Sequence, residues 1–89
     1  MEIIIHRVNS IRKLNILPTR YGVEIDVRSY RSNLILNHEP KNSGDKLYDY
    51  LGRYKNGTII FNIKEAGIEY EVISLAKKFK IKSFFFIGC

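Results

Sequence analysis

The chain has 89 residues, of which 45% are hydrophobic, and a formal net charge of +6. This length allows one domain at most, and a domain of this size buries only about 60% of the surface that its unfolded chain exposes. Aliphatic residues dominate and no segment is both Pro/Gly-rich and highly charged, which excludes a disordered chain, whereas the positive charge leaves anionic partners open.

The chain opens with a short β-branched run, residues 2–6, which predicts a buried strand. His6 and Arg7 interrupt this run at once, so it has neither the h-region of a signal peptide nor the length of a membrane span. One helical turn is predicted over residues 10–14, and Pro18 then stops any helix. We therefore expect a cytoplasmic protein without a membrane span.

Residues 21–28 alternate and predict a strand with two chemically different faces. The apolar face carries Val23, Ile25 and Val27. The polar face carries Glu24, Asp26 and Arg28. Ser32-Asn33 is a turn signal and residues 34–36 form a second short strand, so two strands joined by a brief connection are predicted. They deliver Asn37, His38 and Glu39 at the end of the second strand.

The second half of the chain predicts two helices and two strands. Asp45 is placed to cap a short helix through Leu51, and residues 58–64 form a strand after a turn at Asn56-Gly57. Apolar residues between Gly67 and Lys80 have helical spacing, and residues 83–87 form a last apolar strand. Because strands that alternate with helices imply βαβ units, the predicted class is α/β with mostly parallel strands.

Two features near the end of the chain bear on partners. Lys77, Lys78, Lys80 and Lys82 cluster at the end of the predicted helix, where cations favour the negative end of the helix dipole. We interpret them as a solvated helix end, with a nucleic-acid patch as the alternative, and expect no nucleic-acid partner. The single Cys89 has no partner in the chain, which excludes an intramolecular disulfide and a cysteine-based zinc site and indicates a reducing compartment.

Polar groups gather at or near the C-terminal ends of four predicted strands, which is where parallel α/β folds bind ligands. Glu24 and Asp26 stand two apart on one strand face, so their carboxylates project the same way and can share one hard cation. The alternative is an exposed polar face on a half-solvated strand. Asn62 and Lys64 occupy the equivalent end of the later strand.

His6 and His38 each follow an aliphatic run, and imidazole is the side chain best suited to move protons near neutral pH. Cleavage of a phosphodiester needs a base for the nucleophile, an acid for the leaving oxygen and cations for the phosphoryl charge. Arg7 and Lys64 can supply fixed positive charge to a phosphate, and an ordinary surface charge is the alternative for each.

In these segments the chain resembles the glycerophosphodiester phosphodiesterase family. The resemblance rests on His6-Arg7, on residues 22–27 and on residues 34–39, and residues 59–64 are similar to the family's next strand motif. It implies His6 and His38 as the acid/base pair. It implies a site for Mg²⁺ or Ca²⁺ at Glu24, Asp26 and Asn62, with Arg7 and Lys64 as phosphate contacts. The implied reaction converts a small-molecule glycerophosphodiester and water into glycerol 3-phosphate and an alcohol.

The chain departs from the family pattern at three places. Val8 stands where the family usually has Gly, residues 17–20 do not match the usual Pro-Glu-Asn-Thr element, and Asn62 falls where a carboxylate ligand is expected. An amide oxygen can bind a cation but brings no charge.

Family members are (β/α)₈ barrels, which need about 250 residues. The resemblance therefore implies a partial TIM barrel, roughly its first half, with residues 1–89 as a single incomplete phosphodiesterase-type domain. Any activity would then depend on self-association or on a C-terminal half that completes the barrel. A non-catalytic anion-binding or interaction module is the first alternative, and a nucleic-acid-binding domain is the second.

Overall fold

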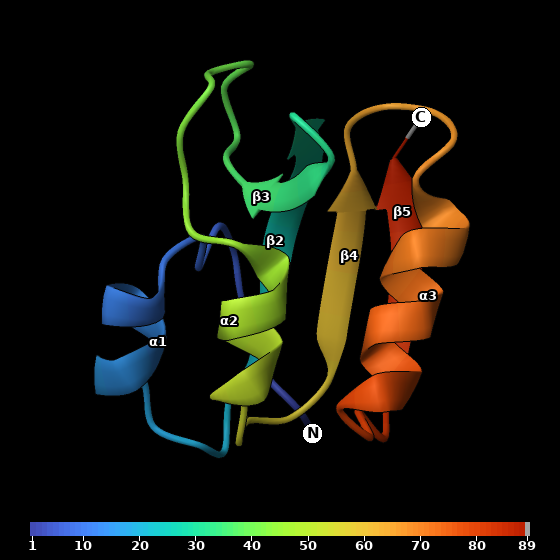
Figure 1. Cartoon of the computed structure of the whole chain (residues 1–89). Coiled ribbons are helices and arrows are strands. Elements are labelled where there is room, and N and C mark those ends of the chain that lie inside the picture. The colour runs from blue at the N-terminus through green and yellow to red at the C-terminus, as the bar shows by residue number, and fades with distance from the viewer. Residues whose placement is uncertain (89) are drawn as a thin grey trace.

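Figure 1 shows a computed structural model of the chain, which describes residues 1–88; Cys89 and the argument that rests on it lie outside the described residues. The strands are β1 (Ile4–Ile5), β2 (Gly22–Tyr30), β3 (Asn33–Leu36), β4 (Ile59–Ile63) and β5 (Phe84–Gly88). The helices are α1 (Ile11–Ile16), α2 (Leu47–Gly52) and α3 (Glu69–Lys78). The predicted α/β class is confirmed.

The five strands form one mostly parallel sheet in the order β1-β2-β4-β5, with β3 attached to β2. The pairs β1–β2, β2–β4 and β4–β5 are parallel, whereas β3 is antiparallel to β2. On one side of β2, its first residues pair with β1 and its last residues with β3. On the other side, β4 pairs with residues 23–27 of β2. Strand β2 is therefore the centre of the sheet.

The core lies on one face of this sheet, because alternate residues of β2 and β4 point toward the helices. The buried strand residues are Val23, Ile25, Val27, Ile59, Phe61 and Ile63. Leu14 of α1, Tyr50 of α2 and Val72 of α3 belong to the same cluster, and Figure 1 shows the three helices on one side of the sheet. Full burial of an aliphatic or Phe side chain is worth about 1.5–3 kcal/mol, so this face stabilises the fold.

The opposite face of the sheet carries the polar residues of β2 and a row of apolar ones. Phe85 and Ile87 of β5 are 62% and 46% exposed on it. In the parallel register Asp26 of β2 is the partner of Asn62 of β4, and Asn62 is the partner of Ile87. Side chains of such partners point to the same face. The predicted polar face of residues 24–28 is therefore the face that the described helices leave uncovered.

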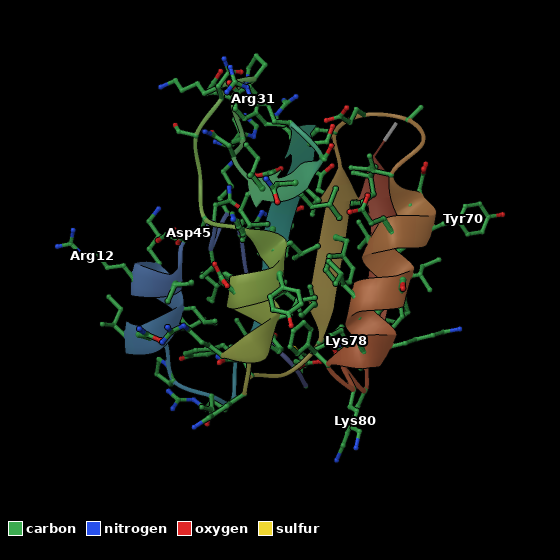
Figure 2. All side chains as sticks on the ribbon, viewed as in Figure 1. Arg12, Arg31, Asp45, Tyr70, Lys78 and Lys80 are labelled. Carbon is green, nitrogen blue, oxygen red and sulfur yellow. The ribbon has the colours of Figure 1, made fainter. Side chains whose placement is uncertain are left out.

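Two local predictions, one for a helix cap and one for a turn, are wrong. Asp45 does not cap α2, whose N-cap is Lys46; it accepts a hydrogen bond of 2.6 Å from the backbone N–H of Ile11 at the start of α1. Figure 2 labels Asp45 beside α1. Asn33 lies in β3, because the hairpin turns at Arg31 and Ser32, whose φ angles of 48° and 67° match the twist of the flanking strands.

The sequence predicts no membrane span. Among residues 1–88, no helix combines the length and the apolar character that crossing a bilayer requires.

Candidate functional site

The structure brings most of the predicted site residues to one end of the uncovered face. His6 follows β1 directly, Glu24 and Asp26 lie within β2, and Asn62 lies beside Asp26 on β4. His38 reaches the same place differently, since β3 is antiparallel and runs back along β2. The backbone N–H of Asn37 donates to the carbonyl of Asp26 at 3.1 Å. The short hairpin therefore returns His38 to the carboxylate.

Asp26 is the centre of the site and is only 1% exposed. Its Oδ2 accepts a hydrogen bond of 2.9 Å from Nδ2 of Asn9, and its backbone N–H donates to Oδ1 of Asn9 at 2.8 Å. Nζ of Lys64 lies 3.6 Å from its Oδ1. A buried carboxylate is costly unless it is paired and hydrogen-bonded. For Asp26, this burial rules out the alternative of an exposed polar face.

Each histidine has one carboxylate beside its Nδ1. His6 Nδ1 lies 3.7 Å from Oε1 of Glu24, and His38 Nδ1 lies 3.6 Å from Oδ2 of Asp26. These separations are ion-pair distances and are too long for hydrogen bonds. The His6 side chain is 77% exposed and that of His38 36%. Because Nδ1 of each ring faces a carboxylate, Nε2 is the nitrogen left for another molecule.

His38 also contains the one buried side-chain nitrogen or oxygen atom of residues 1–88 that has no hydrogen-bond partner. This atom is Nδ1, the same nitrogen that faces Asp26. Most buried polar atoms in proteins are paired, so such an atom calls for an explanation. A modest closing of the 3.6 Å gap to Asp26 would supply the missing bond.

Arg7 and Asn62 are placed near this cluster in different ways. Arg7 is exposed, has a left-handed φ of 55°, and forms no ion pair or hydrogen bond within the described part of the chain. Asn62 lies close over the end of β5, where a Cβ built on Gly88 would come within 2.7 Å of its Oδ1. An ion pair therefore joins Lys64 to Asp26, whereas Arg7 forms none with the described residues.

Sequence reasoning missed the roles of Asn9 and Arg28. Asn9 follows the predicted opening strand in the sequence, and no local pattern pairs it with Asp26. Arg28 was placed on the correct face by strand alternation, but its partners were not foreseen. Its Nε donates to the carbonyl of Asn37 at 3.1 Å and its Nη2 to that of His38 at 2.9 Å. Arg28 therefore fixes the segment that carries His38.

Glu65 is a further carboxylate, and it follows Lys64 directly in the sequence. It accepts hydrogen bonds from the backbone N–H and the hydroxyl of Ser29, the latter at 3.0 Å. Ser29 belongs to the opposite alternation from Asp26, so Glu65 is directed away from the carboxylate pair, as strand alternation predicts.

The donor set can be tested against a divalent cation. Within residues 1–88, no group of three or more His, Cys, Asp or Glu side chains is arranged to hold a metal ion. The predicted site offers two carboxylates and the amide oxygen of Asn62. Mg²⁺ is commonly bound by one or two carboxylates together with waters and substrate phosphate oxygens. Donors of this chemistry suit a cation that completes its coordination with waters and substrate oxygens, and among residues 1–88 they do not form a closed metal site.

Comparison of the chain with models of protein families, with curated proteins and with solved structures found no match. The functional argument consequently rests on the residues of this site.

Proposed function

We propose that the chain is a metal-dependent phosphoric diester hydrolase domain that acts on glycerophosphodiesters. The observation that carries the proposal is the presence of two histidine–carboxylate pairs on one sheet face, His6 with Glu24 and His38 with Asp26, with Lys64 beside the second pair. A phosphodiester hydrolase needs two proton-transfer groups and positive charge at one place. The site offers both.

In this proposal the histidines move the protons of the reaction. One imidazole Nε2 accepts a proton as the oxygen of water forms a bond to phosphorus, and the other donates a proton to the alcohol oxygen as its bond to phosphorus breaks. Glu24 and Asp26 face the Nδ1 side of the two rings, which leaves Nε2 of each ring for the proton transfer. Lys64 and Arg7 offset the negative charge of the phosphoryl oxygens.

Glu24, Asp26 and Asn62 would hold the cation through oxygen atoms. A bound Mg²⁺ or Ca²⁺ would supply positive charge to the phosphoryl oxygens. Oε1 of Glu24 faces His6, and its Oε2 forms no hydrogen bond or ion pair with the described residues. Oδ1 of Asp26 lies beside Lys64. Glu24 is therefore the carboxylate with a free oxygen, and Lys64 competes with a cation at Asp26.

The fold is compatible with the first part of a (β/α)₈ barrel. In such barrels helices cover the outer face of a parallel sheet, side chains of the strands fill the interior, and catalytic residues lie at the C-terminal ends of the strands. The uncovered face with Asp26 and Phe85 would then be the inner wall. A second copy of the chain or a further C-terminal half would complete that wall.

The direct test is release of glycerol 3-phosphate from glycerophosphocholine, measured with Mg²⁺, with Ca²⁺ and with a chelator, alongside the mass of the active species. We expect metal-dependent turnover that falls by about 10²–10⁴-fold in His6→Ala and in His38→Ala. Tyr70→Ala serves as a control because Tyr70 is 88% exposed on α3. Turnover that is unchanged in both histidine variants would refute the assignment.

A non-catalytic anion-binding module is the second candidate, and Asn62 favours it. Where Asn62 stands, a family carboxylate would add a negative charge for the cation, and its loss weakens cation binding. Binding of glycerophosphocholine without turnover by the folded protein, lost in Lys64→Met, would support this candidate over the hydrolase.

A further inference from the structure

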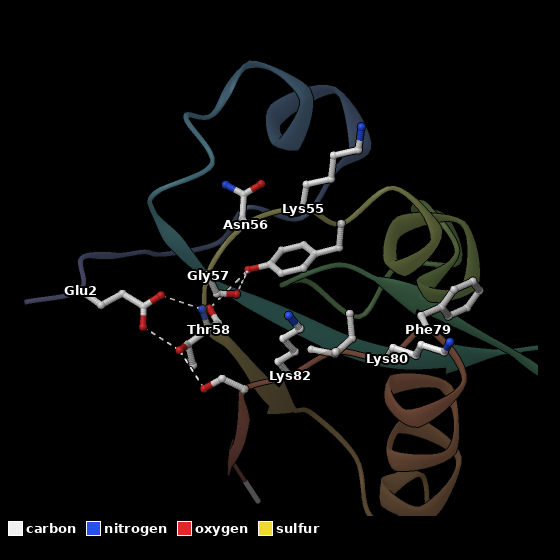
Figure 3. Close-up of a pocket in the computed structure, with 11 residues that line it drawn as sticks. Glu2, Lys55, Asn56, Gly57, Thr58, Phe79, Lys80 and Lys82 are labelled. Atoms are coloured by element: carbon white, nitrogen blue, oxygen red, sulfur yellow. Dashed lines mark hydrogen bonds between the residues drawn. The ribbon is translucent and has the colours of Figure 1, made fainter.

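A hollow of about 450 Å³ lies at the opposite end of the sheet from the candidate site, where β4 and β5 begin (Figure 3). It is formed by the loop that precedes β4 and by the turn that joins α3 to β5. Its principal lining residues are Glu2, Tyr54, Lys55, Phe79, Lys80 and Lys82. This volume lies within the range of sites that hold small molecules.

Three of the lining residues are exposed lysines, and the single acid among them is already engaged. Glu2 accepts hydrogen bonds from the hydroxyl of Thr58 at 2.6 Å and from its backbone N–H at 2.7 Å. These bonds, the one from the side chain foremost, lower the pKa of Glu2. Within residues 1–88, every ion pair lies at the candidate site, so none includes Lys55, Lys80 or Lys82.

The chain brings these lysines together from two segments. Lys55 comes from the loop before β4, whereas Lys80 and Lys82 flank the half-buried Ile81 in the turn after α3. In Figure 3 Lys55 lies on one side of the hollow and Lys80 and Lys82 lie on the other, and the ammonium group of Lys55 points away from the other two. The turn is held by hydrogen bonds from the N–H of Lys80 to Lys77 and from the N–H of Ile81 to Ala76.

Lys80 adopts a left-handed φ of 57°, at the position where helices most often end in glycine. For a residue with a side chain this conformation is less favourable than the right-handed one. The sequence therefore keeps a lysine where glycine would fit the backbone more easily, and that lysine lines the hollow.

Part of the remaining lining is apolar. The hydroxyl of Tyr54 donates to the carbonyl of Gly57 at 2.6 Å, which holds the ring in place, and burial raises the pKa of this hydroxyl. Phe79 and Ile81 line the same hollow. A multiply charged anion would attract these ammonium groups, whose exposed side chains can turn toward it, and the apolar part of the lining would contact the group that bears the charge.

We propose that this hollow binds a small molecule that carries two or more linked phosphate groups, with Lys55, Lys80 and Lys82 as its contacts. The site shares no residue with the candidate phosphodiesterase site and does not depend on the function proposed there.

The test is calorimetric or NMR titration of the full chain with inorganic pyrophosphate, inorganic phosphate and ADP at a fixed ionic strength. The triple variant Lys55→Gln, Lys80→Gln, Lys82→Gln removes the contacts. The control triple variant Lys13→Gln, Lys41→Gln, Lys46→Gln removes the same charge from exposed lysines outside the hollow. We expect pyrophosphate affinity to fall at least about tenfold in the first variant and less than about twofold in the second.

Equal weakening in the two triple variants would overturn the proposal, because it would show diffuse attraction to a basic protein. Absence of pyrophosphate binding, or phosphate bound as tightly as pyrophosphate, would also overturn it. Tighter binding of ADP than of pyrophosphate would show that the apolar lining contacts the group that bears the phosphates. Equal affinity would show that only the phosphates are recognised. Lys80→Gly retains the backbone conformation of the turn, so weaker pyrophosphate binding by this variant could not be attributed to misfolding.

Discussion

Replacement of Asn9 by alanine tests whether Asp26 is held in place by its side-chain partner. Asn9 makes two hydrogen bonds to Asp26, one to the carboxylate at 2.9 Å and one from the backbone N–H at 2.8 Å. Leaving a buried donor or acceptor without its partner costs about 1–3 kcal/mol, and more for a charged group. Because Asn9 is half-buried and water can replace part of it, we expect a loss of about 2 kcal/mol.

A loss of this size should lower the midpoint temperature of unfolding by about 8–16 °C, since this temperature shifts by about 4–8 °C per kcal/mol in a domain of this length. Thermal and urea unfolding measure the effect, and Asn15→Ala, an exposed position on α1, is the matched control. Asn9→Asp should be destabilised further at neutral pH, because a second carboxylate then faces Asp26. The difference in stability between Asn9→Asp and the wild-type protein should narrow as the pH falls. An Asn9→Ala variant as stable as the control would refute the role of these bonds.

Three further predictions concern the site, the core and the segment before β1. Lys64→Met should bind divalent cations more tightly, because the ammonium group beside Asp26 is removed. It should also have a higher KM for glycerophosphocholine, because the same ammonium group is lost as a phosphate contact. Titration measures the first effect and kinetics the second, and weaker cation binding or an unchanged KM would contradict the prediction. Tyr50→Phe should lose about 1–3 kcal/mol in urea unfolding, because the Tyr50 hydroxyl donates to the buried carbonyl of Val8 at 2.7 Å. The hydrogen bonds from Thr58 lower the pKa of Glu2. The stability that Glu2 contributes is therefore complete above about pH 4.5 and is lost as the pH falls through the lowered pKa. Glu2→Gln should remove this part of the acid dependence of unfolding, and an unchanged acid dependence would contradict the prediction.

The sequence predicted those parts of the fold that depend on local periodicity. Alternation in residues 21–28 placed Val23, Ile25 and Val27 in the core and Asp26 on the other face. The periodic segment from 67 to 80 became α3. These patterns persist in the structure because a strand or a helix that is covered on one side repeats its environment at a fixed spacing.

The remaining features depend on contacts between distant segments, which periodicity does not encode. Ile11 and Asp45 are 34 positions apart, and Asn9 and Asp26 are 17 apart, yet each pair is joined by a hydrogen bond. The position of His38 depends on the direction of β3, which the residue pattern alone left open. Pairing of this kind is determined by the packed sheet and so becomes visible only in three dimensions.

The charge balance around Asp26 links the stability of the fold to the proposed chemistry. Nζ of Lys64 lies 3.6 Å from the buried carboxylate and compensates the charge of Asp26 before any cation binds. A divalent cation at Oδ1 would have to displace that ammonium, while Glu24 offers a free oxygen at a lower cost. The proposed hydrolase should therefore bind its cation weakly alone and more tightly with a phosphodiester, whose negative charge would attract both the cation and the displaced lysine.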